Sequence, residues 1–303
     1  MKRSKPVDIS AFRSQYPFTS QYVDINGLKY HYLDEGKGEA LMMVHGNPTW
    51  SFYYRRLISE LSPDYRTIAP DHMGCGLSDK PSPDQYNYQL KSRVDDLEIL
   101  IGHLQITENI TLILHDWGGM IGMAYGVKYP EKISRIVVMN TAAFLPPDGK
   151  SLPFRLWMIR NLKFFAVPAV LGLNLFSIGA LYMATHKGLA KQVRSGLKAP
   201  YNSWQNRMAT LKFVQDIPVT DKDPSFKLAL SVDLNLHKLV NKPMLICWGN
   251  HDFVFDQAYL EEWQLRFPDA EVHCFENAGH YVLEDEPDAL VSLIKDFLKR
   301  HAI

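Results

Sequence analysis

The sequence of 303 residues is poor in cysteine and has no excess of charge of either sign. Its three cysteines, Cys75, Cys247 and Cys274, lie far apart and show no C-x-x-C spacing. This spacing argues against a disulfide framework or a zinc site and favours a reducing compartment. The 33 basic and 33 acidic side chains cancel, so the net charge predicts neither a nucleic acid nor an acidic partner. We expect no cofactor and no metal.

No apolar run follows the basic N-terminus, so we expect no signal peptide and a cytoplasmic location. One uncharged stretch, Phe164–Thr185, has the length of a membrane-spanning helix. Pro168, Gly172, Asn174 and Gly179 interrupt it, which argues against a span. We instead predict two apolar helices that line a hydrophobic pocket, with peripheral, reversible contact with a membrane surface as a further expectation.

Short apolar runs alternate with longer helix-like stretches, which is the pattern of an α/β protein with a mostly parallel sheet. Eight runs are predicted to be strands: Tyr22–Asn26, Leu28–Leu33, Glu39–Val44, Tyr65–Ala69, Ile110–Leu114, Ile133–Met139, Lys242–Trp248 and Glu271–Phe275. The first two form a hairpin around an Asn-Gly turn. Helices are predicted at Trp50–Leu61, Lys91–Leu104, Gly118–Tyr129, Gln257–Phe267 and Pro287–His301.

One long segment breaks this alternation. From Ala142 to Asp233 no buried strand is evident, and the composition is helical and rich in Trp, Phe, Met and Leu. We therefore predict a helical cap, residues 142–233, inserted after the sixth strand. The core domain would then comprise residues 1–141 and 234–303.

An abrupt turn follows the apolar strand that ends at Leu114. His115-Asp116-Trp117-Gly118-Gly119 combines a strand end with a helix start rich in small residues. This is the setting of a nucleophile elbow, in which the apex side chain stands above the sheet. The apex of such elbows is commonly serine in G-x-S-x-G, whereas here it is Asp116, and Leu114 replaces the first glycine. The pattern predicts an α/β-hydrolase fold with a carboxylate nucleophile.

A carboxylate is ionised at neutral pH and attacks without a base, and with an sp³ carbon it forms an ester. Hydrolysis of that ester needs a histidine to activate water. His280 follows Gly279 and the last strand, and Asp252 follows the penultimate strand as the acid that orients it. The strand before the cap ends in Asn140 and offers no carboxylate there. The order nucleophile, acid, histidine is that of this fold.

Two further residues are candidates for stabilising an anion. The backbone N–H groups of Asn47 and Trp117 are placed to face an oxyanion, and their side chains add an amide and an indole donor. Such donors in an apolar pocket suit a halide or a carboxylate. Simpler roles are expected for three neighbours: His45 is structural, Asp71 orders its loop, and His251 adjoins the acid.

These motifs resemble those of the haloalkane dehalogenases, in His45–Trp50, Ser78–Pro81 and His115–Gly119. The resemblance covers nearly the whole predicted core domain. It implies the roles of nucleophile, base and acid given above, and it implies that Asn47 and Trp117 bind the halide. The combination of this asparagine with the acid after the penultimate strand is similar to the third subfamily of that group.

Longer blocks resemble the β-lactone decarboxylases of bacterial long-chain olefin biosynthesis: Pro70–Pro81, Leu90–Glu98, Asn140–Phe144, Ala199–Trp204 and Phe213–Pro218. This resemblance implies a cis-3-alkyl-4-alkyl-oxetan-2-one substrate, with CO2 and a long-chain cis-alkene as products. It also implies the condensing enzyme, the reductase and the β-lactone synthetase of that pathway as partners. A cap rich in Phe and Leu fits long alkyl chains, at about 0.8 kcal/mol for each buried CH₂.

Other functions stay open at this point. Hydrolysis of alkyl halides would use the same five residues. An epoxide hydrolase also has an Asp elbow and would need phenol donors such as Tyr182 and Tyr201, but Asn47 disfavours it. A receptor or scaffold on an inactive hydrolase fold is disfavoured because no member of the triad is missing. A membrane protein is disfavoured by the interrupted apolar stretch.

Overall fold

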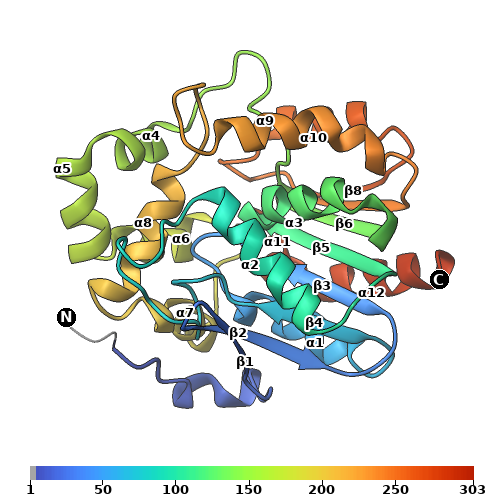
Figure 1. The fold of residues 1–303 in the computed structure, drawn as a ribbon, viewed down its shortest axis with the longest axis horizontal. Helices are drawn as coiled ribbons and strands as arrows, with labels where there is room; N and C mark the ends of the chain where they lie inside the picture. The colour runs from blue at the N-terminus through green and yellow to red at the C-terminus, as the bar shows by residue number, and fades with distance from the viewer. Residues whose placement is uncertain (1–4) are drawn as a thin grey trace.

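A computed structural model describes residues 5–303, and within this range eight strands form one sheet in the order β1-β2-β4-β3-β5-β6-β7-β8 (Figure 1). The strands are β1 (Gln21–Ile25), β2 (Leu28–Glu35), β3 (Ala40–Val44), β4 (Arg66–Pro70), β5 (Ile110–Asp116), β6 (Ile133–Thr141), β7 (Met244–Gly249) and β8 (Glu271–Phe275). The signal-peptide prediction rests partly on residues 1–4, which lie outside the described residues.

The sheet is antiparallel only at one edge. β1 pairs antiparallel with β2, and β2 with β4, whereas the neighbours from β4 to β8 pair in parallel. Asn26 and Gly27 both have positive φ, 54° and 81°, as the tight hairpin turn requires. The predicted eight-stranded, mostly parallel sheet is confirmed, and β5 runs two residues further than predicted, through Asp116.

Helices cover both faces of the sheet. Those of the core are α1 (Arg55–Leu61), α2 (Leu90–His103), α3 (Trp117–Lys128), α9 (Phe226–Asn235), α10 (Gln257–Arg266), α11 (Val282–Asp285) and α12 (Pro287–Arg300). The segment after β6 contains α4 (Phe154–Asn161), α5 (Lys163–Ala166), α6 (Leu175–Met183), α7 (Lys191–Lys198) and α8 (Met208–Gln215). The helical stretch predicted over Trp50–Leu61 starts as a 3₁₀ turn at Ser51–Tyr54 and continues as α1.

Strand β3 shows why both faces of the sheet are covered. Its residues are all buried, and they alternate between two hydrophobic cores. Met42 and Val44 pack into the core beneath α2, α3, α9 and α10. Leu41 and Met43 pack into the opposite core, beneath α1 and α12. Side chains two residues apart share a face, so a parallel strand of this kind is apolar along its whole length.

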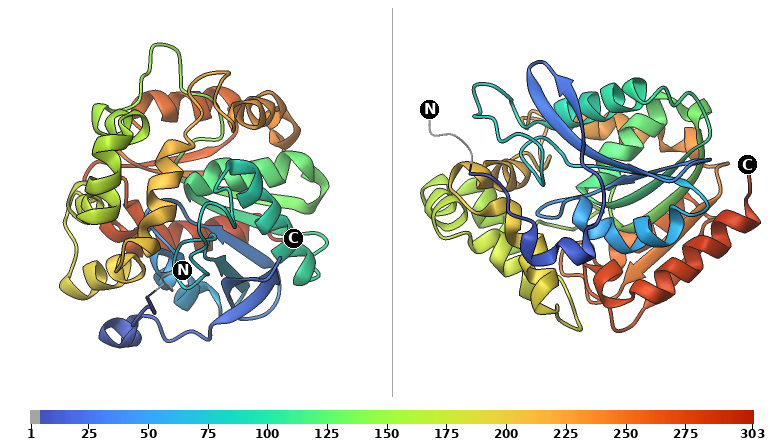
Figure 2. Two further views of the ribbon diagram at one scale, coloured as in Figure 1. Left: turned by 60° about the vertical axis from the view of Figure 1, so that its left-hand side comes forward. Right: turned by 90° about the horizontal axis from the view of Figure 1, so that it is seen from below.

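The segment between β6 and β7 is helical and stands at the carboxyl edge of the sheet (Figures 1 and 2). The predicted boundary at residue 233 falls inside α9, which packs against α3 of the core. The uncharged stretch forms α5, a π-helical turn over Val167–Gly172, and then α6. Asn174 lies at the bend with a φ of 57°.

No single helix within residues 5–303 has both the length and the hydropathy of a membrane span. Lys163–Gly172 and Leu175–Met183 meet that test only as a pair, and they are bent by 76°. The bend falls at one of the breaks that the sequence indicates.

Close packing of α3 against β3 generates a test of the fold. A Cβ atom at Gly118 would collide with the carbonyl oxygen of Val44, which is backbone and cannot turn away. We expect Gly118→Ala to lower the free energy of unfolding by about 1–3 kcal/mol or more. Urea unfolding followed by circular dichroism measures this. The matched control is Gly102→Ala in α2, where a Cβ meets nothing within 4 Å, and it should stay within about 1 kcal/mol of wild type. Equal stability of the two variants would contradict the packing.

Candidate active site

Asp116 occupies a strained turn between β5 and α3. Its φ of 51° and ψ of −127° lie outside the regions that residues with a Cβ usually adopt. Small residues allow the turn: a Cβ at Gly46 would collide with the Asp116 side chain, and one at Gly119 with the Thr141 side chain. The Thr141 hydroxyl donates to the backbone carbonyl of Asp116. The turn therefore holds the Asp116 carboxylate out beyond the end of the sheet.

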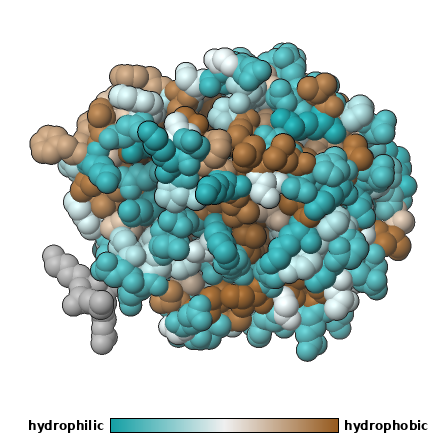
Figure 3. All heavy atoms as spheres, turned by 45° about the horizontal axis from the view of Figure 1, so that its top comes forward, coloured by the Kyte–Doolittle hydropathy of each residue, from teal (hydrophilic) through white to brown (hydrophobic). Residues whose placement is uncertain are grey.

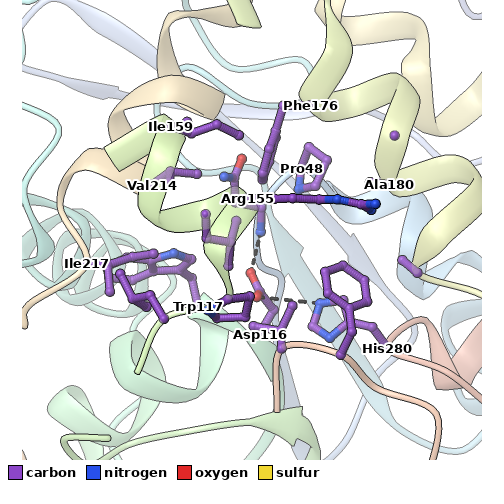
Figure 4. A pocket seen from close by; sticks show the side chains of 18 of the residues that line it. Pro48, Asp116, Trp117, Arg155, Ile159, Phe176, Ala180, Val214, Ile217 and His280 are labelled. Carbon is purple, nitrogen blue, oxygen red and sulfur yellow. Dashed lines mark hydrogen bonds and ion pairs between the residues drawn. The ribbon is translucent and has the colours of Figure 1, made fainter. Parts of the chain in front are cut away.

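His280 connects two carboxylates, and Figure 4 shows it beside one of them, Asp116. Its Nδ1 lies 2.7 Å from Oδ2 of Asp252, and its Nε2 lies 3.5 Å from Oδ2 of Asp116. All three residues are buried, each with no more than 8% exposure. The three residues that the sequence predicts as nucleophile, base and acid thus lie together, although they come from three separate loops. Their catalytic roles stay predictions.

Asn140 holds the acid in place. Its amide nitrogen donates to Oδ2 of Asp252 at 3.1 Å, and its amide oxygen accepts from the backbone N–H of Gly249 at 2.8 Å. The other oxygen of Asp252 accepts from the backbone N–H of Val254 at 2.7 Å. The sequence predicts only that this strand end offers no carboxylate, and the positioning role of Asn140 was missed. An amide at the end of β6, directed at the loop after β7, is the signal for it.

Asn47 contacts Asp116 through its backbone. Its N–H donates to Oδ1 of Asp116 at 2.6 Å. Its side-chain nitrogen donates to the carbonyl of Thr210 at 3.1 Å, which uses one of the two amide hydrogens. The structure therefore places Asn47 at the site as predicted. Its backbone N–H, however, is hydrogen-bonded to the Asp116 carboxylate, and its side chain is hydrogen-bonded to Thr210 of α8.

Trp117 follows Asp116 in the turn, and a buried guanidinium, that of Arg93, lies near its indole ring. The Arg93 guanidinium lies 5.4 Å from the Trp117 ring and stacks 3.7 Å from the ring of Phe213. Its Nη1 pairs with Oδ2 of Asp216 at 3.0 Å. Sequence reasoning missed Arg93, because nothing local shows that α2 aims it at the elbow. A cation at this depth makes the potential near the indole more favourable for an anion.

The electrostatics of the triad keep Asp116 ionised. Burial alone would raise the pKa of the Asp116 carboxyl, but the hydrogen bond and charge of His280 hold that pKa below its ordinary value. Burial disfavours a charged ring at His280, but attraction by Asp252 and hydrogen bonding to both carboxylates raise the pKa of His280 to about 10. At neutral pH the site therefore contains an imidazolium between two carboxylates.

A cavity of about 560 Å³ opens above this triad. Asn47, Asp116, Trp117 and His280 form part of its wall, and the rest is mostly apolar and comes largely from α4, α5 and α6. Arg155 crosses the cavity in Figure 4, and its Nη1 lies 3.0 Å from the sulfur of Met183. The size is within the usual range for a small-molecule site, and the lining favours an apolar ligand.

The residues given simpler roles are where the sequence places them. His45 accepts from the backbone N–H of His72 at 3.0 Å. The carboxylate of Asp71 accepts from the backbone N–H groups of Ser51 and Leu77, which orders both loops. His251 stacks on another histidine and lies one residue from the acid.

The phenols needed by an epoxide hydrolase are elsewhere. The Tyr201 hydroxyl donates to the carbonyl of Thr49 at 3.2 Å, and the Tyr182 side chain is exposed. Neither residue lines the cavity above Asp116. The two candidate cap phenols are therefore not placed to donate to an epoxide at Asp116, and the tyrosines that do line the cavity, Tyr259 and Tyr281, come from the core.

Comparison with known proteins agrees with the fold. Residues 39–287 match the model of the alpha/beta hydrolase fold, and the chain belongs to that family. It is 50% identical over 283 residues to a cis-3-alkyl-4-alkyloxetan-2-one decarboxylase from Shewanella oneidensis, a match that covers 93% of this chain and 89% of the relative. A protein of the same name from Xanthomonas campestris pv. campestris is 42% identical, over 95% and 98% of the two chains.

Haloalkane dehalogenases are more distant relatives. Haloalkane dehalogenase 2 from Mycobacterium tuberculosis is 30% identical, with 95% of this chain and 98% of the relative covered. The crystal structure of a haloalkane dehalogenase from Bradyrhizobium elkani superposes with a TM-score of 0.84 at 22% identity, over 94% and 98% of the two chains. The second match supports the fold alone.

The charge on His280 generates a prediction for the pH dependence of stability. Its pKa in the folded protein, about 10, exceeds the ordinary value of 6.5. The stabilisation is therefore complete below pH 6.5 and is lost as the pH rises toward 10. We expect the difference in unfolding free energy between wild type and His280→Gln to be largest near pH 6 and to shrink by pH 10. Urea titrations across this range measure it, and parallel curves for the two proteins would refute the charged histidine.

Proposed function

We propose that this chain converts cis-3-alkyl-4-alkyl-oxetan-2-ones into cis-alkenes and CO2, the reaction named for its relatives from Shewanella oneidensis and Xanthomonas campestris. The observation that carries the proposal is an ionised carboxylate, Asp116, at the base of a large apolar cavity. A strained four-membered lactone is reactive toward such a nucleophile. The apolar wall suits two alkyl chains, each CH₂ contributing about 0.8 kcal/mol when buried.

The lactone ring would lie beside Asp116, with its carboxyl group toward Trp117 and Asn47. The indole N–H and the second amide hydrogen are donors for a developing carboxylate. On the same side of the site, the Arg93 guanidinium lies 5.4 Å from the Trp117 ring and is paired with Asp216. The alkyl arms would then extend along the apolar wall formed by residues such as Ile159 and Phe176.

One route balances without water or an added proton. An oxygen of Asp116 attacks the ring carbon that bears the ring oxygen, and the bond between those ring atoms breaks to release a carboxylate. The bond from this carboxylate to the neighbouring carbon then breaks. Its electron pair forms the alkene while the bond to Asp116 breaks, so CO2 leaves and Asp116 is regenerated. Attack from the back inverts the carbon, and anti elimination from the inverted ester gives the cis-alkene.

His280 acts in this route as a fixed positive charge. Asp116 loses its negative charge when the ester forms, and a carboxylate appears on the substrate within the same cavity. An imidazolium held by Asp252 stabilises both arrangements, which lowers the cost of moving the charge. No proton transfer by His280 is needed to close the cycle.

Hydrolysis of alkyl halides is the second candidate function, because a relative at 30% identity is named as a haloalkane dehalogenase. The same carboxylate would displace halide and form an alkyl ester. His280 would then have to be neutral to activate water, so the ester state would have to lower its pKa by removing the charge of Asp116. The two functions thus differ in whether water attacks the ester.

The substrate also suggests where the chain works. We propose that it acts in the cytoplasm with the condensing enzyme, the reductase and the β-lactone synthetase of olefin biosynthesis. A long-chain β-lactone is both reactive and sparingly soluble, which favours a short path from the enzyme that makes it.

Replacing the nucleophile tests the function directly. We expect purified wild type to release alkene and CO2 from a long-chain cis-β-lactone, and Asp116→Ala to release neither. Gas chromatography of the alkene, with circular dichroism to verify folding, measures this. Asp252→Asn should keep part of the activity, because it retains a hydrogen-bond acceptor for His280 while removing one charge. If Asp116→Ala formed alkene at the wild-type rate, Asp116 could not be the nucleophile.

Isotope labelling separates the two candidate reactions. In water enriched in oxygen-18, we expect repeated turnover of a β-lactone to leave Asp116 unlabelled, because the same oxygen attacks and departs. Turnover of a bromoalkane through a hydrolysed ester would place the heavy oxygen in Asp116. Mass spectrometry of the peptide that contains Asp116 reads the label, and heavy oxygen there after lactone turnover alone would overturn the water-free route.

A further inference from the structure

Charge is divided unequally along this neutral chain. Between residues 149 and 215 there are ten Lys and Arg residues and no Asp or Glu, which leaves 23 basic against 33 acidic residues elsewhere. The ten are Lys150, Arg155, Arg160, Lys163, Lys187, Lys191, Arg194, Lys198, Arg207 and Lys212. The helical segment at the carboxyl edge is therefore strongly positive, and the remainder of the molecule is negative.

Several of these cations are free to meet a ligand. Lys163, Lys191 and Lys198 are exposed and form no ion pair with any residue of the range 5–303. In contrast, Lys150 pairs with Asp256 of the core at 2.5 Å. The free lysines lie on α5 and α7, so the positive potential of this segment is directed outward.

The same segment exposes large apolar side chains. Phe164 is 98% exposed, Phe154 is 71% exposed and Leu173 is 67% exposed. Others are Trp157 on α4, Leu162 between α4 and α5, Phe165 on α5, and Leu175, Ile178 and Tyr182 on α6. In Figure 3, hydrophobic side chains reach the surface at the left-hand edge, where Figure 1 places α4 and α5. A cluster of this kind is a mark of an interaction surface.

This apolar surface is continuous with the wall of the active-site cavity. Phe154, Phe165 and Leu175 are exposed to solvent and also line the cavity above Asp116. The mouth of the cavity therefore opens within the apolar cluster. A ligand that leaves an apolar phase at this surface could enter the cavity without its alkyl chains crossing water.

We propose that the cap face, defined here as the exposed side of α4, α5, α6 and α7, docks on a lipid bilayer that contains anionic lipids. Phe164 and Leu173 enter the acyl layer, and Lys163, Lys191 and Lys198 lie among the anionic headgroups. The cavity mouth then faces the membrane, and substrate and alkene exchange directly with the bilayer. Only this exchange rests on the proposed function; the docking itself does not.

Two observations together select a bilayer as the occupant. A bilayer offers both an apolar layer and a layer of negative charge, which match the two kinds of exposed side chain on the cap face. Three residues, Phe154, Phe165 and Leu175, belong both to the exposed surface and to the cavity wall. This indicates that the partner bound at the cap face also supplies the apolar ligand. An acidic protein would be complementary in charge to the lysines, but it would not explain why the exposed apolar side chains also line the cavity.

Sedimentation with vesicles tests the docking. We expect the full chain to pellet with vesicles of phosphatidylcholine and phosphatidylglycerol and to stay largely in solution with phosphatidylcholine alone. Phe164→Ser and Lys163→Glu should each weaken binding to the mixed vesicles, by about fivefold or more for the charge change. Matched controls are Leu265→Ser, at an apolar position of α10 that is 76% exposed, and Lys299→Glu, on α12; both should bind as wild type does.

Every other outcome counts against the proposal. Absence of binding to both kinds of vesicle, or equal binding to both, would overturn it. An effect of Lys163→Glu without an effect of Phe164→Ser would show adsorption by charge alone, and equal losses in the controls would show that the cap face is not the surface used. All four substitutions are at exposed positions, and thermal unfolding verifies that each variant is folded.

Activity assays separate this inference from the function on which the exchange rests. Phe164 does not line the cavity, so Phe164→Ser should turn over a water-soluble, short-chain cis-β-lactone at the wild-type rate. The same variant should be slower on a long-chain lactone supplied in mixed vesicles. Equal rates on the vesicle substrate would refute direct exchange. No turnover of either lactone by wild type would refute the proposed function and leave the docking result standing.

Discussion

The strained backbone at Asp116 is the constraint on which the rest of the site depends. A non-glycine residue with φ of 51° and ψ of −127° costs about 1–3 kcal/mol, and it persists only where the surroundings fix it. The surroundings fix this backbone by close packing. Gly118 lets α3 approach the end of β3, and Gly46 leaves space for the Asp116 side chain. The turn places a carboxylate at the edge where the loops after β3, β7 and β8 also meet.

A carboxylate held at that depth needs opposite charge, and this need explains the arrangement around it. The imidazolium of His280 lies between Asp116 and Asp252, and the N–H of Asn47 donates to the free oxygen of the nucleophile. Asn140, at the end of β6, donates a hydrogen bond to the Asp252 carboxylate. This strand end is the other position in the fold at which the acid could lie. The result is a charged site with an apolar cavity above it, suited to a substrate that is apolar before reaction and anionic during it.

Much of this was predictable because the signals are local. Buried parallel strands are apolar along their length. In Asp116-Trp117-Gly118-Gly119, the predicted nucleophile at the strand end and the small residues that allow the turn are consecutive in the sequence. His280 and Asp252 follow predicted strands, and the carboxyl ends of parallel strands share one edge. The order of these residues along the chain was therefore enough to predict that Asp116, Asp252 and His280 lie close together.

The remaining features depend on contacts between distant segments. The role of Asn140 needs the loop after β7 to pass beside it, and that of Arg93 needs α2 to lie behind the elbow. The amide of Asn47 turns to Thr210 only because α8 packs there. Likewise, the 3₁₀ turn at Ser51–Tyr54 has no local sequence signature, and Asp71 accepts from its first N–H.

The charged residues of the site thus come from the core, and most of the apolar wall of the cavity comes from the cap helices. The central claim is that this charge acts on a lactone rather than a halide. The most direct test measures kcat/KM of the purified protein for a long-chain cis-β-lactone, by alkene and CO2, and for a bromoalkane of equal chain length, by bromide. The account predicts a much higher value for the lactone. Rapid bromide release with no alkene would contradict it.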